Sequence, residues 1–273
     1  MRDAIEVHGL RKSYGSHPVL RGLDFAVRSG EIFALLGING AGKTTALECM
    51  EGLQKYEEGT ITVNGKMGIQ LQSQALPAHI RPMEALRLFA KWNRGAVDRA
   101  WVRSLVQSLG MEEIEKKQYA QLSTGQKRRL HLALALIRDP EIVFLDEPTA
   151  GLDVEGRLSL HQQIRSLKAR GKTIILTSHD MAEVETLCDR IAILNEGRIA
   201  FCGTARELTD QVGRKYLIHI KTEQAEKRLE ADNIEEALLS LLLELKQRGE
   251  RVLDIKVDRG TLEQHFLELA GRV

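Results

Sequence analysis

A glycine-rich segment at residues 37–44 most constrains the fold of this 273-residue chain. It reads Gly-Ile-Asn-Gly-Ala-Gly-Lys-Thr and fits the pattern G-x-x-x-x-G-K-[ST]. An apolar run at residues 31–36 precedes it, and a predicted helix begins at Lys43 and ends near Gly52, which is the context that the pattern requires. Glycines let backbone N–H groups wrap a phosphate, and the helix N-terminus adds partial positive charge. The sequence therefore predicts a phosphate-binding loop.

The side chains at the end of this loop have predicted roles of their own. Lys43 is expected to reach the β- and γ-phosphates of a nucleotide, and the Thr44 hydroxyl is expected to bind Mg²⁺. The N–H groups of Ala41 and Thr45 are expected to contact the phosphates. The loop residues predicted to bind the nucleotide are Gly37, Asn39, Gly40, Ala41, Gly42, Lys43, Thr44 and Thr45.

A pair of carboxylates follows a second apolar run, at residues 142–145. Phosphoryl transfer to water needs a carboxylate that holds a metal ion and a group that orients or deprotonates the water. Asp146 is expected to bind Mg²⁺ through a water molecule, and Glu147 is expected to act as the general base. Acidic pairs at strand ends are common, so this interpretation depends on the presence of Lys43.

The order of the predicted elements favours an α/β fold with a largely parallel sheet. Strands are predicted at residues 4–8, 22–28, 31–36, 60–63, 67–71, 141–145, 173–177 and 190–194, a helical block at 81–110, and helices at 155–170 and 180–188. The pattern of predicted elements changes after about Leu208. A strand (216–221), a helix (234–247), a strand (251–257) and a helix (262–270) are predicted there. We therefore expect a first domain over residues 1–208, with a helical insert at about 75–138, and a small α/β domain over residues 209–273.

Composition excludes several classes of protein. The chain has 39 Lys and Arg against 38 Asp and Glu, so a net charge of +1 gives no global attraction to nucleic acid. No stretch approaches the roughly 18 apolar residues of a membrane span, and no secretory signal is evident. The three cysteines lack the CxxC spacing of a zinc site, and their odd number argues against a disulfide framework. A soluble protein of the reducing cytosol is expected.

Three further motifs resemble the ATP-binding cassette (ABC) family of ATPases. Residues 122–126 read Leu-Ser-Thr-Gly-Gln, where the family signature is L-S-G-G-Q, so four of the five positions match. The Gly-Leu-Asp sequence at residues 151–153 resembles the D-loop of the family. Ser178 and His179, after a predicted strand, resemble the segment of its switch histidine.

Two single residues extend the resemblance, which covers about residues 4–205. Tyr14 stands where the family has an aromatic residue that stacks on adenine. Gln72 resembles the Q-loop glutamine, a metal ligand, with Gln70 and Gln74 as alternatives.

The chain departs from the family pattern at two positions. Ile38 occupies a loop position that is often proline, with little expected effect. Thr124 places a β-branched side chain where the signature has glycine, which is expected to weaken or reshape the signature contact.

The resemblance implies an ATPase with ATP and Mg²⁺ as ligands, built as a P-loop NTPase-type core with an antiparallel β subdomain, an α-helical insert and a small C-terminal α/β unit. Two copies are implied to share each ATP, with the loop of one copy facing the signature of the other. The implied catalytic residues are Lys43, Glu147 and His179, and Tyr14 joins the loop residues named above in binding ATP. The implied metal ligands are Thr44, Gln72 and Asp146. Ser123, Gly125 and Gln126 are implied to contact the ATP of the other copy, and Asp153 is implied to couple the two sites.

The resemblance also implies a separate membrane permease, which would dock on the helical insert near residues 72–92 and hold the chain on the cytoplasmic face. Candidate anchors, most of them expected to be core residues, are Leu76, Ile80, Met83 and Phe89. The partner cassette could be identical or different, and no nucleic acid is expected. The ending at residues 262–269 resembles cassettes of multidrug, antibiotic and lipid or polysaccharide exporters. The alternatives are a soluble mechanical ATPase and a regulator that binds ATP and barely hydrolyses it.

Overall fold

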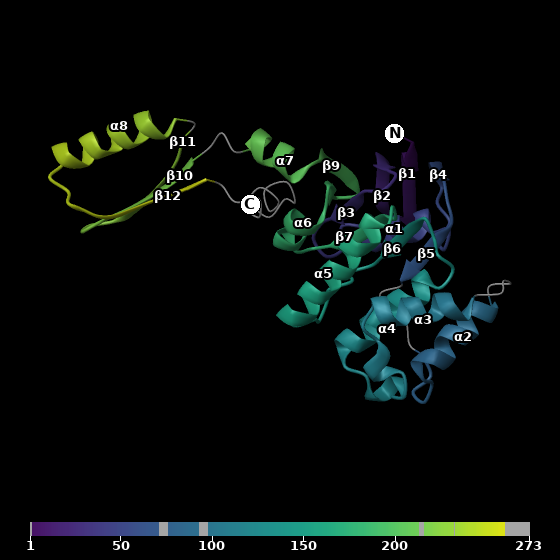
Figure 1. The fold of residues 1–273 in the computed structure, drawn as a ribbon. Helices are drawn as coiled ribbons and strands as arrows, with labels where there is room; N and C mark the ends of the chain where they lie inside the picture. Colours follow the sequence, from purple (N-terminus) through teal and green to yellow (C-terminus); the bar gives the residue numbers. More distant parts are fainter. Residues whose placement is uncertain (1, 71–75, 93–97, 213–215, 232, 260–273) are drawn as a thin grey trace. The chain divides into compact units, whose positions relative to one another are not determined.

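Short apolar strands build the central sheet of the protein. The computed structural model describes residues 2–70, 76–92, 98–212, 216–231 and 233–259, and the chain divides into two units, Met1–Cys202 and Gly203–Val273. In the first unit a six-stranded sheet has the order β5-β6-β7-β3-β8-β9 (Figure 1). Its strands are β3 (Ile32–Leu36), β5 (Met67–Gln70), β6 (Ile142–Leu145), β7 (Thr173–Ser178), β8 (Arg190–Asn195) and β9 (Arg198–Gly203). The pairs from β5 to β8 are parallel, which explains why β3, β6 and β7 are buried throughout.

A second, antiparallel sheet lies at the N-terminal end of the chain. It consists of β1 (Asp3–Tyr14), β2 (His17–Arg28) and β4 (Glu58–Val63) in the order β2-β1-β4. Helix α1 (Lys43–Met50) belongs to the same hydrophobic cluster as both sheets, with Leu47 in the helix, Leu10 in β1 and Phe144 in β6. The loop that precedes α1 is therefore held between two sheets.

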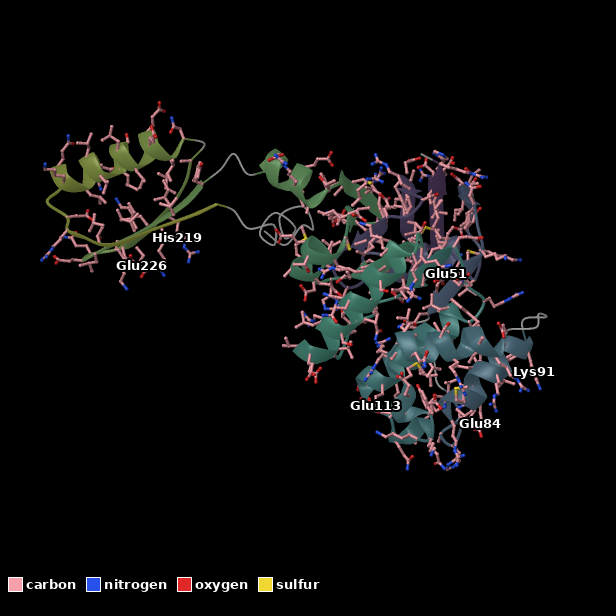
Figure 2. All side chains as sticks on the ribbon, in the orientation of Figure 1. Glu51, Glu84, Lys91, Glu113, His219 and Glu226 are labelled. Carbon is pink, nitrogen blue, oxygen red and sulfur yellow. The ribbon has the colours of Figure 1, made fainter. Side chains whose placement is uncertain are left out.

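The helical insert contains three helices in the described part of the chain. They are α2 (Pro82–Trp92), which carries Glu84 and Lys91 (Figure 2), α3 (Arg99–Ser108) and α4 (Thr124–Leu136). Short 3-10 turns at Glu112–Ile114 and Tyr119–Gln121 separate α3 from α4. A Cβ at Gly68 of β5 would collide with the carbonyl oxygen of Ala135, so α4 packs directly on the sheet edge. The expected helical block at 81–110 is confirmed for the described residues by α2 and α3, and its residues 93–97 lie outside them.

The four candidate anchors on the insert are only partly buried. Leu76, Ile80, Met83 and Phe89 all have an intermediate exposure, so the expectation that most are core residues is wrong. The large apolar side chains that are exposed on α2 are Leu88 and Trp92, at 49% and 76%. An amphipathic helix at the surface turns its apolar stripe toward the core. In α2 the fully buried positions are those of Ala85 and Leu86, and not those of Met83 and Phe89.

Two helices connect successive parallel strands of the central sheet. Helix α5 (Val154–Ala169) follows β6 and contacts β7, and helix α6 (Met181–Leu187) follows β7 and contacts β3. Because parallel strands end at the same edge of the sheet, the segments after β3, β6 and β7 lie together there. These segments carry the residues of the predicted site.

The second unit is a small α/β structure with its own core. It contains α7 (Ala205–Val212), β10 (Tyr216–Thr222), β11 (Glu226–Ala231), α8 (Ile234–Gln247) and β12 (Val252–Arg259), with an antiparallel sheet in the order β11-β10-β12. Ile218 and Ile220 pack against Leu245 of α8, whereas His219 alternates to the other side of the sheet (Figure 2). The strand β11 is not among the predicted elements. The predicted helix at 262–270 lies outside the described residues.

The expected α/β architecture, with an antiparallel β subdomain, a helical insert and a C-terminal α/β unit, is confirmed. The division between the two units falls after Cys202, whereas the sequence placed it after Leu208. Among the described residues, no helix has the length and apolar character that crossing a membrane requires.

Candidate nucleotide-binding site

The loop between β3 and α1 needs glycine at its two ends. Gly42 has φ +103°, in the left-handed region, and a Cβ there would lie 2.9 Å from the Cδ2 atom of Leu20. A Cβ at Gly37 would lie 2.7 Å from the carbonyl oxygen of Leu194. Substitution at either position therefore strains the backbone or displaces a packed neighbour. The glycines of the motif are explained by the fold around the loop as well as by a phosphate.

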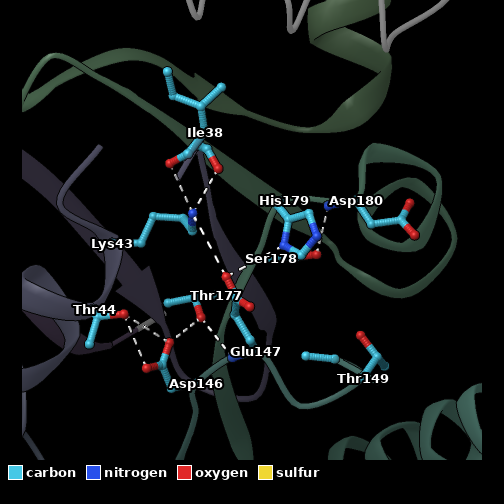
Figure 3. A network of polar contacts seen from close by, with 12 residues as sticks. Ile38, Lys43, Thr44, Asp146, Glu147, Thr149, Thr177, Ser178, His179 and Asp180 are labelled. Carbon is cyan, nitrogen blue, oxygen red and sulfur yellow. Dashed lines mark hydrogen bonds and ion pairs between the residues drawn. The ribbon is translucent and has the colours of Figure 1, made fainter. Parts of the chain in front are cut away.

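Lys43 points its ammonium group back over this loop (Figure 3). Its Nζ atom donates to the carbonyl oxygens of Gly37, at 2.8 Å, and Ile38, at 3.1 Å, and the residue is only 6% exposed. Burial lowers the pKa of Lys43 from its ordinary value, while the carboxylates of Glu147 and Asp146 raise it. The Oε1 atom of Glu147 lies 4.0 Å from Nζ. The loop thus holds a buried cation whose ion pair with Glu147 is at the long end of the range for such contacts.

Hydroxyl groups surround the Asp146 carboxylate at the end of β6. The Thr44 Oγ1 atom lies 3.1 Å from Oδ2, and Thr177 Oγ1 donates to Oδ1 at 2.5 Å (Figure 3). Magnesium prefers such hard oxygen ligands, so the donor set of Thr44 and Asp146 fits Mg²⁺. The third predicted ligand, Gln72, lies outside the described residues, as does its alternative Gln74. The other alternative, Gln70, is fully buried in β5.

Glu147 has a backbone conformation that is rare for a residue with a side chain. Its φ is +42°, and its backbone N–H donates to Thr177 Oγ1 at 2.8 Å. The Oε1 atom lies 3.4 Å from Nδ1 of His179, which follows β7. Strained backbone of this kind is concentrated at functional sites. The structure therefore brings Lys43, Glu147 and His179 into one network of contacts, as Figure 3 shows.

Thr177 is the member of this network that the sequence analysis missed. One hydroxyl group both donates to Asp146 and accepts from the Glu147 N–H, so it fixes the two carboxylate residues relative to β7. Thr177 is fully buried in an apolar strand. The only sequence signal is a hydroxyl residue one position before the Ser178-His179 pair.

The signature residues form the start of α4. Ser123 is the N-cap, its hydroxyl accepts from the Gln126 N–H at 3.3 Å, and the Gln126 side chain accepts from the Ser123 N–H at 3.1 Å. This reciprocal capping box leaves the helix N-terminus, with its partial positive charge, at the surface.

The D-loop residues share this surface with the signature. Ser123 and Gly125 line a groove of about 530 Å³ together with Gly151 and Asp153. Asp153 is also the N-cap of α5, because its Oδ1 atom accepts from the Gly156 N–H at 2.8 Å. The signature residues and the predicted coupling residue therefore face the same side of the molecule.

Tyr14 ends β1, and its side chain is 47% exposed. The Gln54 amide donates to its hydroxyl at 3.1 Å, and Lys12 Nζ lies 5.1 Å from the ring centre. An exposed aromatic ring of this kind offers a face for stacking on a base.

Comparisons with known proteins identify the family. The profile of the ABC transporter family matches residues 20–150. The chain is 31% identical to the linearmycin resistance ATP-binding protein LnrL of Bacillus subtilis (strain 168), over 98% of each chain. It is 32% identical to the daunorubicin resistance ATP-binding protein DrrA3 of Streptomyces coeruleorubidus, over 98% of this chain and 96% of the relative. The Nod factor export ATP-binding protein I of Rhizobium meliloti (strain 1021) is 40% identical over 76% of this chain and 66% of its own.

A solved structure supports the same assignment. The structure of an ATP-binding subunit of an ABC transporter is similar with a TM-score of 0.69 and 29% identity, over 77% of this chain and 93% of that one. The resemblance inferred from the motifs is confirmed. The chain therefore belongs to the ABC transporter family and is one of its ATP-binding proteins, an ABC ATPase.

Proposed function

We propose that this chain is the ATP-hydrolysing subunit of an ABC exporter, which binds ATP as a pair of cassettes and drives a separate membrane subunit. The observation that carries the proposal is the network that joins Lys43, Glu147 and His179 beside the Thr44–Asp146 pair. A cation, a carboxylate beside a histidine and a set of hard oxygen donors are the groups that phosphoryl transfer to water requires.

The loop and its lysine bind the triphosphate. The Lys43 ammonium donates to two loop carbonyls, and the phosphate oxygens of ATP are stronger, charged acceptors at the same place. Thr44 and Asp146 would hold Mg²⁺, which when bound neutralises charge on the phosphate oxygens. Tyr14 offers its exposed ring to the adenine base.

Glu147 acts on the attacking water. Its carboxylate accepts a proton from the water as the water oxygen bonds to the γ-phosphorus atom, and the bond to ADP breaks, so the products are ADP and phosphate. His179 is 3.4 Å from that carboxylate and contacts the γ-phosphate, where it stabilises the charge of the transition state. Thr177 holds Glu147 and Asp146 in register while this happens.

The signature surface completes the site of a second copy. Ser123 and Gly125 lie at the exposed N-terminus of α4, which favours a negative ligand. Because the loop and the signature are both present in one chain, two identical chains can form two such sites, although a different cassette could also be the partner. Asp153 lies in the same groove and would couple the two sites.

Export through a separate membrane subunit is supported by the relatives. The three relatives described above are named for resistance to linearmycin or daunorubicin, or for Nod factor export. A membrane partner would hold the chain at the cytoplasmic face, and the exposed Leu88 and Trp92 of α2 make the insert a suitable docking surface.

Affinity purification of the tagged chain from detergent-solubilised native membranes tests this proposal. We expect a polytopic membrane protein to co-purify in stoichiometric amount, identified by mass spectrometry. Replacement of Leu88 by Ala should lower its recovery, whereas replacement by Ala of Leu53, a leucine of similar exposure outside the insert, should not. Recovery only from the soluble fraction, alone or with ribosomal or nucleic-acid partners, would contradict export and favour a mechanical ATPase.

A further inference from the structure

A buried carboxylate joins the two segments that carry Glu147 and His179. Glu183, in the first turn of α6, is only 3% exposed. Its Oε2 atom accepts hydrogen bonds from Thr149 Oγ1 and from Ser178 Oγ, both at 2.9 Å, and its Oε1 atom lies 3.0 Å from His161 Nε2. A buried charge is costly unless it is paired or hydrogen-bonded, so these partners are what allow Glu183 to be there.

The two hydroxyl partners are neighbours of the reacting groups. Thr149 lies two residues after Glu147, in the segment that leads to Asp153, and Ser178 directly precedes His179. A pocket of about 160 Å³ is lined by both hydroxyl residues and by Glu147, His179 and Glu183. One carboxylate thus fixes the distance between the segment after β6 and the segment after β7.

Helix α5 also contacts the Glu183 carboxylate. His161 of α5 meets Glu183, and one helical turn earlier Arg157 contacts Asp180, the residue after His179, at 2.8 Å. Asp180 in turn caps α6, because its Oδ1 atom accepts from the Glu183 N–H at 3.1 Å. Since Asp153 caps α5, the D-loop residue is connected through α5 to the segment of His179.

We propose that Glu183 is a positioning residue for ATP hydrolysis, which sets the place of Glu147 relative to His179 and connects both to the segment of Asp153. The inference rests on the proposed function, since it concerns the same reaction. The backbone of Glu147 is strained, so contacts with other segments must keep it in this conformation. The Thr149–Glu183 hydrogen bond is such a contact, because Thr149 lies in the segment that follows Glu147. Glu183 does not itself touch the nucleotide.

Removal of the Thr149 hydroxyl tests the role without removing volume. Thr149→Val keeps the shape of the side chain but cannot donate to Glu183, whereas Thr149→Ser keeps the donor. We expect Thr149→Val to lower the kcat of the full chain about tenfold, since a hydrogen bond to a charged group is lost. We expect the KM for ATP to change by less than about twofold, because the phosphate loop is unaltered. Thr149→Ser should restore most of kcat.

A matched control separates positioning from stability. Thr173 is buried at the start of β7, at the end of the strand away from Ser178 and His179. Its hydroxyl accepts from the Gly30 N–H at 2.9 Å. Thr173→Val should lower the unfolding temperature at least as much as Thr149→Val, with an unchanged kcat. An equal loss of kcat in Thr173→Val, or no recovery in Thr149→Ser, would overturn the proposal.

The same assay distinguishes this inference from the proposed function. If the wild-type chain hydrolyses ATP and Glu147→Gln does not, the proposed function stands. An unchanged kcat in Thr149→Val would then contradict only the positioning role of Glu183 and would leave the proposed function intact. If the wild-type chain does not hydrolyse ATP, both proposals are wrong.

Discussion

Glu147 combines an uncommon backbone with a carboxylate at the centre of the site. Its φ is +42°, and its Oε1 atom lies 4.0 Å from Lys43 Nζ and 3.4 Å from His179 Nδ1. A residue in this conformation stores strain that the surrounding fold must offset. The Thr177 hydroxyl, which accepts from its N–H, is part of that support.

Replacement of Glu147 by Gln should therefore separate binding from chemistry. The amide keeps the shape of the side chain but cannot accept a proton from water, so we expect the hydrolysis rate to fall by about 10²–10⁴. The Kd for ATP should stay near the wild-type value, and ATP should remain bound. Steady-state phosphate release and equilibrium ATP binding measure the two effects. Hydrolysis at a near-normal rate would remove Glu147 from the role of general base.

Glu51 shows that a buried carboxylate near the site can oppose folding. It is largely buried at the end of α1, and its Oε1 atom has no hydrogen-bond partner among the described residues. Burial raises the pKa of Glu51 from 4.5 to about 7, and Asp146 and Glu48 add to the shift. The unfolded chain loses this proton at lower pH than the folded chain does. As the pH rises from about 4.5 to 7, the folded state therefore loses stability.

Glu51→Gln should accordingly stabilise the first unit at high pH only. The amide keeps the neutral form at every pH, so we expect a gain of up to about 3 kcal/mol at pH 8 and little gain at pH 4.5. Urea unfolding followed at both pH values measures the difference. Glu155→Gln, at an exposed position in the first turn of α5, serves as the control. A gain of the same size at both pH values would show that ionisation of Glu51 is not the cause.

Sequence patterns predicted the residues of the site that have a fixed spacing. Lys43 and Thr44 end a motif whose spacing is dictated by the phosphate, and Asp146 and Glu147 follow an apolar strand. Thr177 and Glu183 act through contacts with partners about 30 residues away, in positions where a threonine or a glutamate is unremarkable. Only the folded chain shows that they belong to the site.

At the scale of elements, the cap of α4 has two functions that can be measured separately. Ser123 caps the helix and, in the proposed function, contacts the ATP of a second copy. We expect Ser123→Ala to cost about 1 kcal/mol of stability and most of the ATPase activity. Asp98 caps α3 in the same way, since its Oδ1 atom accepts from the Ala100 N–H at 3.0 Å. Asp98→Ala should cost similar stability with unchanged hydrolysis.

Thermal unfolding and ATP hydrolysis of the two variants separate the contribution of Ser123 to helix stability from its contact with ATP. If Asp98→Ala lost as much activity as Ser123→Ala, the effect of Ser123 would reflect the stability of the helical insert. If Ser123→Ala were fully active, the signature surface would not contact the nucleotide.

The sequence predicts the strands that are unbroken apolar runs, whereas it does not predict β11, which has no such run. The buried strands β3, β6 and β7 correspond to apolar runs, and the predicted bounds of α8, 234–247, match those of the structure. β1 was predicted to end at residue 8, because Gly9, with φ +59°, interrupts the alternation at a bulge. β11 reads Glu-Lys-Arg-Leu-Glu-Ala, and as an edge strand it has too few apolar residues to show a period of two.

At the scale of the whole molecule, the proposed function assigns the loop and the signature of one chain to two different ATP sites. The loop with Lys43 belongs to the network around Glu147, whereas Ser123 lies in the groove with Asp153. A single copy would use its loop for one ATP and its signature for another. In the proposed dimer, two-fold pairing of identical chains would place each loop opposite a signature.

Mixing of two inactive variants tests this central claim most directly. Lys43→Ala leaves the signature intact, and Ser123→Ala leaves the loop intact, so each variant alone should hydrolyse little ATP. In an equal mixture, half of the dimers contain one complete site, and we expect about a quarter of the wild-type rate. A mixture that only averages the two inactive variants would contradict the shared site.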